Sequence, residues 1–293
     1  AITQRLTPVY EPLFSENSYG YRPGKSAKDA IQKVKEYAEQ GYTHAVAMDL
    51  SKYFDTLNHE ILLNILRRNV KDERVIQWIK RYLKSGVMEN GVVMETEEGS
   101  PQGGNLSPLL ANIYLNEFDQ EYQKRGVIFV RYADDIVLLA KSDRAAKRLL
   151  ETSMKYLEGT LKLKVNQEKS RVVSVFAIRN FKFLGFTLGK NGKGIYVRVH
   201  GKSWKKMKSK LKELSSRRSV QSIRPALAKI KVYMRGWLNY YGIADMKNRI
   251  EELNKWLYHR IRMCIWKQWK KPKTKVKNLR KMGVPEDMAW QAG

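Results

Sequence analysis

The chain has 293 residues, of which 43% are hydrophobic, so it is long enough to bury one large core or two modest ones. Its formal net charge of +27 predicts a polyanionic partner. A single cysteine, Cys264, excludes an internal disulfide and a cysteine-based zinc site and favours a reducing compartment. No apolar run approaches the ~18 residues that a membrane-spanning helix needs.

The positive charge is concentrated in the last third of the chain. Residues 1–186 contain 28 Lys or Arg against 23 Asp or Glu, whereas residues 187–293 contain 28 against 6. Such a surface favours nucleic acid, because binding releases the counterions condensed on the phosphate backbone. A solvated basic protein, such as a ribosomal accessory factor, and a protein bound to an anionic membrane are the alternatives.

The first half of the chain alternates between helical and strand-like patterns. It starts without Met, in a segment typical of the middle of a helix, and lacks the basic flank and apolar core of a signal peptide, so we expect a fragment. The predicted elements are a helix from an N-cap at Ser26 to Gly41, a buried strand Ala45–Leu50, a helix from Asn58, a helix over 75–86, a loop Gly99–Pro108 and a helix over 109–126.

The second half is predicted to complete a sheet and then to become helical. VIFVRYADDIVLLAKS (127–142) predicts two strands around a tight turn, followed by a helix over 143–163 and a short strand FKFLGFTL (181–188). This order indicates an α+β fold with an antiparallel sheet backed by helices over 1–187. Helical patterns over 188–293 predict a second, all-α domain.

Two adjacent aspartates, Asp134 and Asp135, lie between the two strands of this hairpin. Carboxylates about 4 Å apart repel by about 4 kcal/mol at an effective dielectric of 20. They either face water at the turn, share a proton or hold a divalent cation. Asp49 follows another predicted buried strand, and if the two strands are neighbours, three carboxylates meet at one edge. Such oxygen ligands suit Mg²⁺, and two ions could serve phosphoryl transfer.

The motifs around these aspartates resemble those of group II intron-encoded reverse transcriptases, in the same order, from about residue 8 to residue 290. YADD resembles the catalytic hairpin, MDLSKYFD the first metal-binding motif and GSPQGGNLSPLLANIYLN the segment that holds template and nucleotide. LKLKVNQEKSRVV and FKFLGF resemble the two following motifs, SYGYRPGKSAKDAI a fingers segment and RGWLNYYG the thumb. The resemblance implies a right-hand polymerase palm with partial fingers, followed by a helical thumb or maturase domain.

The resemblance also implies roles at individual positions. Asp49, Asp134 and Asp135 match the metal-binding aspartates, and the carbonyl of Leu50 matches a further contact to two Mg²⁺ ions, for which Mn²⁺ is a substitute. Lys169 matches a lysine that protonates the departing pyrophosphate, although a lysine in a basic protein is more often a solvated side chain.

Other matched positions imply contacts to nucleotide and primer. Phe54 matches the ring that excludes a 2′-hydroxyl, with a core phenylalanine as the alternative. Tyr53, Gln102 and Gly103 are expected at the nucleotide. Gly103 and Gly104 would let the backbone approach the base pair closely, although seen alone these two glycines would equally fit a flexible loop. The segment Phe183, Leu184 and Gly185 matches the primer grip, with an ordinary edge strand as the alternative.

The basic C-terminal region is expected to contact RNA. Residues 253–285 contain 11 Lys or Arg and no acidic residue. Helical spacing of Leu253, Leu257, Ile261 and Ile265 predicts one buried face, and we expect Trp237 and Trp256 in the helical core. The residues predicted to contact RNA are Lys205, Lys208, Lys255, Arg262, Lys270 and, with a structural turn as its alternative, Arg22.

The sequence therefore predicts an RNA-directed DNA polymerase that also binds its group II intron RNA and assists splicing. Expected partners are that RNA, an RNA template with a DNA primer, and deoxynucleotides, in the bacterial cytoplasm or nucleoid and without a membrane; homodimer formation stays open. The motifs that normally precede SYGYRP and the C-terminal endonuclease module are missing. Alternatives are a maturase that binds RNA without polymerising and a domesticated or defence reverse transcriptase.

Overall fold

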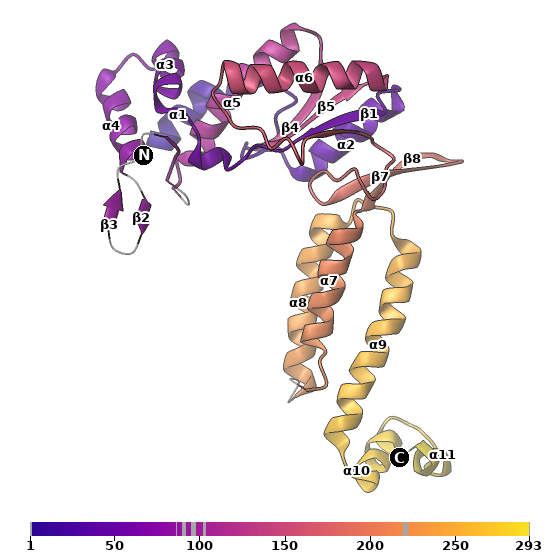
Figure 1. Ribbon diagram of the computed structural model, residues 1–293. Helices are drawn as coiled ribbons and strands as arrows, with labels where there is room; N and C mark the ends of the chain where they lie inside the picture. Colours follow the sequence, from indigo (N-terminus) through magenta and orange to yellow (C-terminus); the bar gives the residue numbers. More distant parts are fainter. Residues whose placement is uncertain are drawn as a thin grey trace. The chain divides into compact units, whose positions relative to one another are not determined.

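The computed structural model of the chain describes residues 2–85, 87–89, 92–94, 98–101, 104–218 and 222–292 (Figure 1). The chain divides into two compact units, residues 1–197 and 198–293. No helix in these described ranges is both long enough and apolar enough to cross a membrane.

The first unit consists of a small sheet with helices on it and a group of helices beside it. Its helices are α1 (Ile2–Tyr10), η1 (Glu11–Leu13), α2 (Ala27–Glu39), η2 (Tyr53–Asp55), α3 (His59–Asn69), α4 (Glu73–Lys84), α5 (Ser107–Lys124) and α6 (Asp143–Gly159). Its strands are β1 (His44–Met48), β2 (Val87–Glu89), β3 (Val92–Met94), β4 (Ile128–Tyr132), β5 (Asp135–Ala140), β6 (Arg171–Ser174), β7 (Phe186–Asn191) and β8 (Gly194–Val199), which continues to the second unit.

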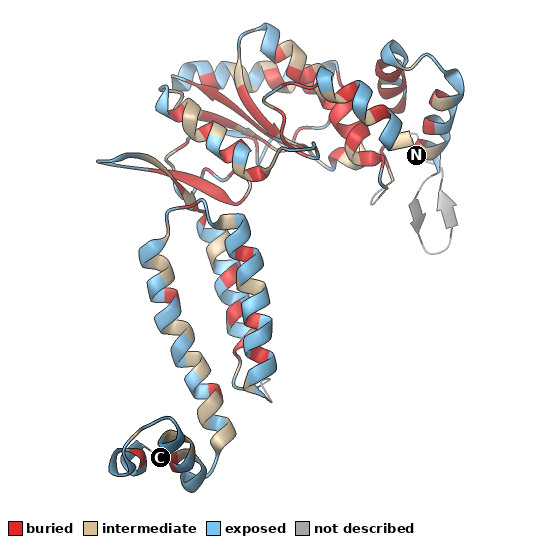
Figure 2. Ribbon diagram, turned by 180° about the vertical axis from the view of Figure 1, so that it is seen from behind, coloured by how far each residue is buried: buried red, intermediate tan, exposed pale blue. Residues whose placement is uncertain are grey.

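The central sheet has the strand order β4-β5-β1-β6, with every pair antiparallel. Strand β5 is buried over five consecutive residues, Ile136 to Ala140, which a strand covered on both faces requires. Helix α6 packs against β1, β5 and β6, while α2 packs against β4 (Figures 1 and 2). The predicted α+β fold with an antiparallel sheet backed by helices is confirmed.

Local sequence signals explain where the helices begin. Ser26 and Asp29 form a reciprocal capping box at the start of α2, so two otherwise unpaired backbone amides are satisfied. Asn58, from which a helix was predicted, caps α3, and Ser142 caps α6. These short polar side chains accept hydrogen bonds from the first turn and fix the point at which each helix leaves the preceding strand or loop.

The structure differs from the sequence prediction at several strands. Strands β2, β3 and β8 were not predicted, and β8 lies within residues 188–293, which were predicted to be helical. Strand β1 ends at Met48, so Asp49 and Leu50 follow the strand rather than ending it. Strand β6 was not predicted, because its segment is short and none of its residues is buried. The segment FKFLGFTL begins as a turn, and its strand β7 starts only at Phe186.

The second unit is helical, as predicted. Its helices are α7 (Gly201–Leu214), α8 (Ile223–Tyr241), α9 (Lys247–Trp269), α10 (Pro272–Lys281) and α11 (Glu286–Ala292). Trp237 is buried, as predicted, and its ring meets that of Trp204 edge-on with centroids 5.6 Å apart. Arg260 of α9 donates to Ser215 Oγ over 2.7 Å and so ties α9 to the end of α7.

We predict that Leu138→Ala lowers the free energy of unfolding of the first unit by 2–5 kcal/mol, about the range for a leucine removed from a core. Leu138 is fully buried at the centre of β5. The matched control is Leu13→Ala, because that side chain is 43% exposed and should cost about 0.5 kcal/mol or less. Urea unfolding followed by far-UV circular dichroism measures both; equal losses would contradict the prediction.

Candidate active site

Three aspartates meet at one edge of the central sheet. Strands β1 and β5 are paired with Met48 opposite Ile136, so the next positions in that register are Asp49 and Asp135. Strands β4 and β5 are paired with Tyr132 opposite Asp135, which leaves Ala133 and Asp134 as a two-residue hairpin turn. The pairing of neighbouring strands therefore brings residue 49 beside residues 134 and 135.

The carboxyl group of Asp135 is affected by both other aspartates. Its crowding by surrounding atoms disfavours the charged form, and the charges of Asp134 and Asp49 add to this effect, so the pKa of Asp135 is raised to about 6. Lys182 acts in the opposite direction. The three carboxylates are thus close enough to interact, as the sequence analysis required.

The segment that precedes β6 lies beside Asp49. The backbone amide of Asp49 donates to Ser170 Oγ over 3.1 Å, and its carbonyl accepts from the amide of Asn166 over 2.8 Å. Lys169 Nζ lies 3.4 Å from Asp49 Oδ2, with both side chains partly exposed. The structure therefore brings Lys169, which only the resemblance had placed at the site, into contact with one of the three aspartates.

The chemistry of this edge fits a divalent cation, although the side chains do not already form a cage. Among the described residues, no three Asp, Glu, His or Cys side chains are grouped closely enough to hold a metal ion. The three carboxylates supply only hard oxygen donors, and their mutual repulsion is the condition that a cation would relieve. Asp49 would exchange its contact with Lys169 for the cation. Leu50, whose carbonyl was predicted as a further ligand, is buried next to it.

The turn that carries Asp134 has an unusual backbone. Ala133 has φ of 56°, which is unfavourable for a residue with a Cβ atom. Gly20 packs directly on this turn, since a Cβ atom added there would lie 2.2 Å from the amide nitrogen of Ala133. The amide of Tyr19 donates to the carbonyl of Arg131 over 2.8 Å. The segment SYGYRP thus supports the hairpin from the side.

The two aromatic residues after Asp49 have different environments. Phe54 is partly buried against the core, and its ring meets that of Tyr53 at 5.4 Å between centroids. Tyr53, which was predicted at the nucleotide, has a buried side chain whose hydroxyl donates to the carbonyl of Ala111 over 2.6 Å. Tyr53 therefore anchors the turn to helix α5 and cannot reach a nucleotide without breaking that bond. Gln102 and Gly103 lie outside the described residues.

The predicted primer grip is a tight turn rather than an edge strand. Phe183 and Phe186 exchange backbone hydrogen bonds of 3.0 and 2.8 Å, and between them Leu184 and Gly185 have φ of 51° and 83°. Two consecutive positive φ values are typical of a type I′ turn. Lys182, which directly precedes the turn, is exposed and acts on the pKa of Asp135. Sequence analysis missed this lysine, and the signal for it was its place next to FLG.

Arg22 has a structural environment, which agrees with the alternative of a structural turn rather than with an RNA contact. Its guanidinium is buried and pairs with Glu11 over 2.8 Å. It also donates to the carbonyls of Ser15 and Ser18 over 2.6 and 2.9 Å. The side chain that was expected to meet a phosphate instead holds the N-terminal segment in place.

The basic residues predicted for RNA in the second unit are accessible. Lys205, Lys208, Lys255, Arg262 and Lys270 are all exposed. Of the predicted buried face of α9, Leu253 is buried and Leu257, Ile261 and Ile265 are half-buried. Trp256 is also half-buried, with Lys208 Nζ 5.0 Å and Arg260 Cζ 5.3 Å from its ring centroid. Such cation–π contacts hold these cations at the surface of the unit.

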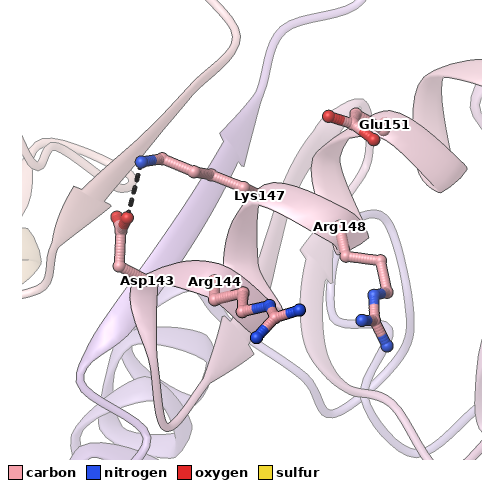
Figure 3. A pocket seen from close by; sticks show the side chains of 5 residues that line it. All are labelled: Asp143, Arg144, Lys147, Arg148 and Glu151. Atoms are coloured by element: carbon pink, nitrogen blue, oxygen red, sulfur yellow. Dashed lines mark ion pairs between the residues drawn. The ribbon is translucent and has the colours of Figure 1, made fainter.

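A shallow pocket on helix α6 does not contribute to the aspartate edge. Figure 3 shows its lining residues, all from one helix, with the ion pair between Lys147 and Asp143 spanning 2.7 Å. Helix α6 begins after the end of β5 that is opposite to Asp135. The pocket is therefore an ordinary charged helix surface, and its carboxylates are suitable controls for those at the sheet edge.

We predict that Asp135→Asn stabilises the chain at pH 8 but not at pH 4, in the presence of a chelator. The folded chain holds the Asp135 proton more tightly than the unfolded chain, where an aspartate titrates near ~3.9, so stability falls as the pH rises from about 4 to about 6. Because the residue is partly solvated, the gain should be about 1 kcal/mol or less.

Thermal unfolding at the two pH values measures this difference, with Glu168→Gln as the control because Glu168 is an exposed carboxylate of the same unit. An equal gain from Asp135→Asn at pH 4 and pH 8 would contradict the proposed cause.

The protein YkfC of Escherichia coli (strain K12) is 34% identical over 226 residues, covering 64% of this chain and 59% of YkfC. The group II intron-encoded protein LtrA of Lactococcus lactis subsp. cremoris is 26% identical over 294 residues, covering 78% of this chain and 47% of LtrA. The chain thus spans about half the length of the curated relatives it matches.

Solved structures support the fold alone. Apo telomerase from Candida tropicalis, truncated from its C-terminal domain, has a TM-score of 0.53 at 14% sequence identity. The match covers 68% of this chain and 44% of the telomerase chain. Telomerase from Candida albicans, in complex with a fragment of telomeric RNA, has a TM-score of 0.53 at 13% sequence identity. The match covers 92% of this chain and 50% of the telomerase chain.

Two family models match successive parts of the chain. The model of the group II intron maturase-specific domain matches residues 204–283. The model of reverse transcriptase (RNA-dependent DNA polymerase) matches residues 1–188, which is well over half of the chain. The resemblance drawn from the sequence is therefore confirmed, and the chain belongs to the reverse transcriptase family.

Proposed function

We propose that this chain is an RNA-directed DNA polymerase that adds deoxynucleotides to a primer 3′-hydroxyl. The observation that carries the proposal is the convergence of Asp49, Asp134 and Asp135 at one sheet edge through the register of β1, β4 and β5. In the reaction, the primer 3′-oxygen forms a bond to the α-phosphorus, the bond to the β-phosphate oxygen breaks, and pyrophosphate leaves.

The three aspartates and the Leu50 carbonyl would hold two divalent cations, which we propose to be Mg²⁺ with Mn²⁺ as a substitute. When bound, such cations neutralise the phosphate charge and stabilise the attacking and leaving oxygens. The aspartates' own part is to supply oxygen ligands at a fixed edge. The raised pKa of Asp135 supports this role, because a carboxylate crowded by like charges gains most from a cation.

Residues around this edge would orient the reactants. Lys169, already 3.4 Å from Asp49 Oδ2, would donate its proton to the departing pyrophosphate once a cation draws Asp49 away. Phe54 would block a 2′-hydroxyl with its ring, and Gln102 and Gly103 would contact the incoming nucleotide. The turn Phe183–Phe186 would hold the primer end, with Lys182 beside Asp135.

A second function, binding of the group II intron RNA and assistance in splicing, is supported by the match of residues 204–283 to the maturase-specific domain. The exposed cations Lys205, Lys208, Lys255, Arg262 and Lys270 would contact its phosphates. We place this activity in the bacterial cytoplasm or nucleoid. It requires no carboxylate at the sheet edge, so the two functions are separable by mutation, and an RNA-binding maturase without polymerase activity is the competing reading.

Primer extension tests the polymerase. We predict that Asp134→Asn with Asp135→Asn lowers extension of oligo(dT) on poly(A), with Mg²⁺ and thymidine triphosphate, by at least about 1,000-fold, since several kcal/mol of charge stabilisation are lost. RNA affinity should stay equal or rise, because two negative charges are removed. The control, Asp143→Asn with Glu151→Gln on α6, should extend normally. Wild-type product formation by the double aspartate variant would refute the site.

A salt titration tests the RNA surface. We predict that replacing Lys255, Arg262 and Lys270 by Ala makes the slope of log K against log salt shallower by about 2, because each phosphate contact to a single strand contributes about 0.7. The matched control replaces three exposed lysines of the first unit, Lys71, Lys124 and Lys155. Fluorescence anisotropy with the cognate intron RNA measures both, and an equal change in the two variants would argue against a dedicated surface.

A further inference from the structure

A fully buried arginine lies directly behind the aspartate turn and has no role in the proposed chemistry. Arg131 is the residue of β4 that precedes Tyr132, and neither it nor its partner Asp119 of α5 is exposed to solvent. Its Nε lies 2.8 and 2.9 Å from the two carboxylate oxygens of Asp119, and its Nη2 lies 2.5 Å from Oδ2. The pair therefore satisfies the charge of both side chains.

The remaining nitrogen of Arg131 is directed elsewhere. Nη1 donates to the carbonyl of Ala133 over 3.0 Å and to Asn112 Oδ1 over 2.9 Å. Ala133 is the residue with φ of 56° that opens the two-residue turn containing Asp134. A planar guanidinium can bind a carboxylate and a carbonyl at once in fixed directions, which an ammonium group cannot do.

A second residue, Gly20, also supports this turn, and it is bonded to Asn112 as well. The side-chain nitrogen Nδ2 of Asn112 donates to the carbonyl of Gly20 over 2.7 Å, and Gly20 packs on the backbone of Ala133. Asn112 thus links Arg131 with Gly20, and both of these residues contact the turn. Both contacts act on the backbone of Ala133, which has the unfavourable φ.

We propose that Arg131 is a positioning residue that holds the Ala133–Asp134 turn in the conformation that presents Asp134 beside Asp49 and Asp135. The proposal rests on the proposed polymerase function. Asp119 holds the guanidinium of Arg131 in place, and this guanidinium holds the carbonyl of Ala133. The turn that begins at Ala133 then sets the position of the Asp134 carboxylate. The contact between Arg131 and the Ala133 carbonyl is not needed to balance the charge of Arg131, because Asp119 already balances that charge.

The decisive variant replaces the buried ion pair by apolar side chains of similar size, Arg131→Met with Asp119→Leu. Such replacements of a buried pair often leave stability unchanged or raised. If Arg131 only balances Asp119, this variant keeps its kcat. If Arg131 positions the turn, kcat falls by about 100-fold, as a displacement of about 1 Å can cause, while the KM for thymidine triphosphate and the affinity for RNA stay near wild type.

Arg131→Lys gives an independent test should the double variant fail to fold. Lysine keeps a cation next to Asp119 but cannot reach the Ala133 carbonyl in the same geometry, so a similar loss of kcat is expected. The control is Tyr114→Phe, which removes a buried hydrogen bond from the same helix α5 to the carbonyl of Leu161. It should leave kcat unchanged, and circular dichroism melting identifies the folded variants.

Mn²⁺ binding separates failure of this proposal from failure of the proposed function. Electron paramagnetic resonance titration of the full chain with Mn²⁺ requires no polymerase activity, so it remains informative if the wild type makes no product. Folded Arg131 variants should bind Mn²⁺ at least about 10-fold more weakly than Tyr114→Phe. A folded Arg131 variant with wild-type Mn²⁺ affinity and, where the wild type is active, wild-type kcat would overturn the proposal.

Discussion

The register between β1 and β5 is the constraint on which the site depends. Met48 opposite Ile136 places Asp49 next to Asp135, and a shift by one residue would turn one of the two side chains to the other face of the sheet. Because β5 is buried on both faces along its apolar run, such a shift would also force each of its core side chains to repack on the opposite face. The same hydrophobic burial that stabilises the sheet therefore concentrates three carboxylates at its edge.

The repulsion between the three carboxylates at this edge is reduced by cationic side chains from separate segments of the chain. Lys169 meets Asp49 from the segment before β6, and Lys182 acts on Asp135 from the turn before β7. Both are exposed, so they can move when substrate or a divalent cation binds. Arg131 differs, since it is buried and bonded to the backbone of the turn rather than to its carboxylates. The exposed cations thus act on the carboxylates, whereas the buried cation supports the backbone of the turn.

Two positions for which the sequence suggested a contact with a ligand have structural contacts in the fold, for one physical reason. Tyr53 and Arg22 are polar residues inside motifs of the family, and each was expected to meet a ligand. In the structure the hydroxyl of Tyr53 binds the carbonyl of Ala111, and the guanidinium of Arg22 binds Glu11 and two carbonyls. A buried polar group needs such partners, and those partners are distant in the chain or hidden in the backbone. A motif cannot distinguish a side chain that serves the fold from one that serves the substrate.

The sequence by itself determined the family and the basic character of the last third of the chain. It also determined the helix starts at Ser26 and Asn58 and the antiparallel hairpin around Asp134. These features follow from periodicity, capping residues and charge, which are properties of consecutive residues. Only the tertiary structure decided that Lys169 reaches Asp49 and that Arg131 binds the Ala133 carbonyl. These contacts depend on side-chain directions and on strand pairing between distant segments, and no short-range pattern specifies either.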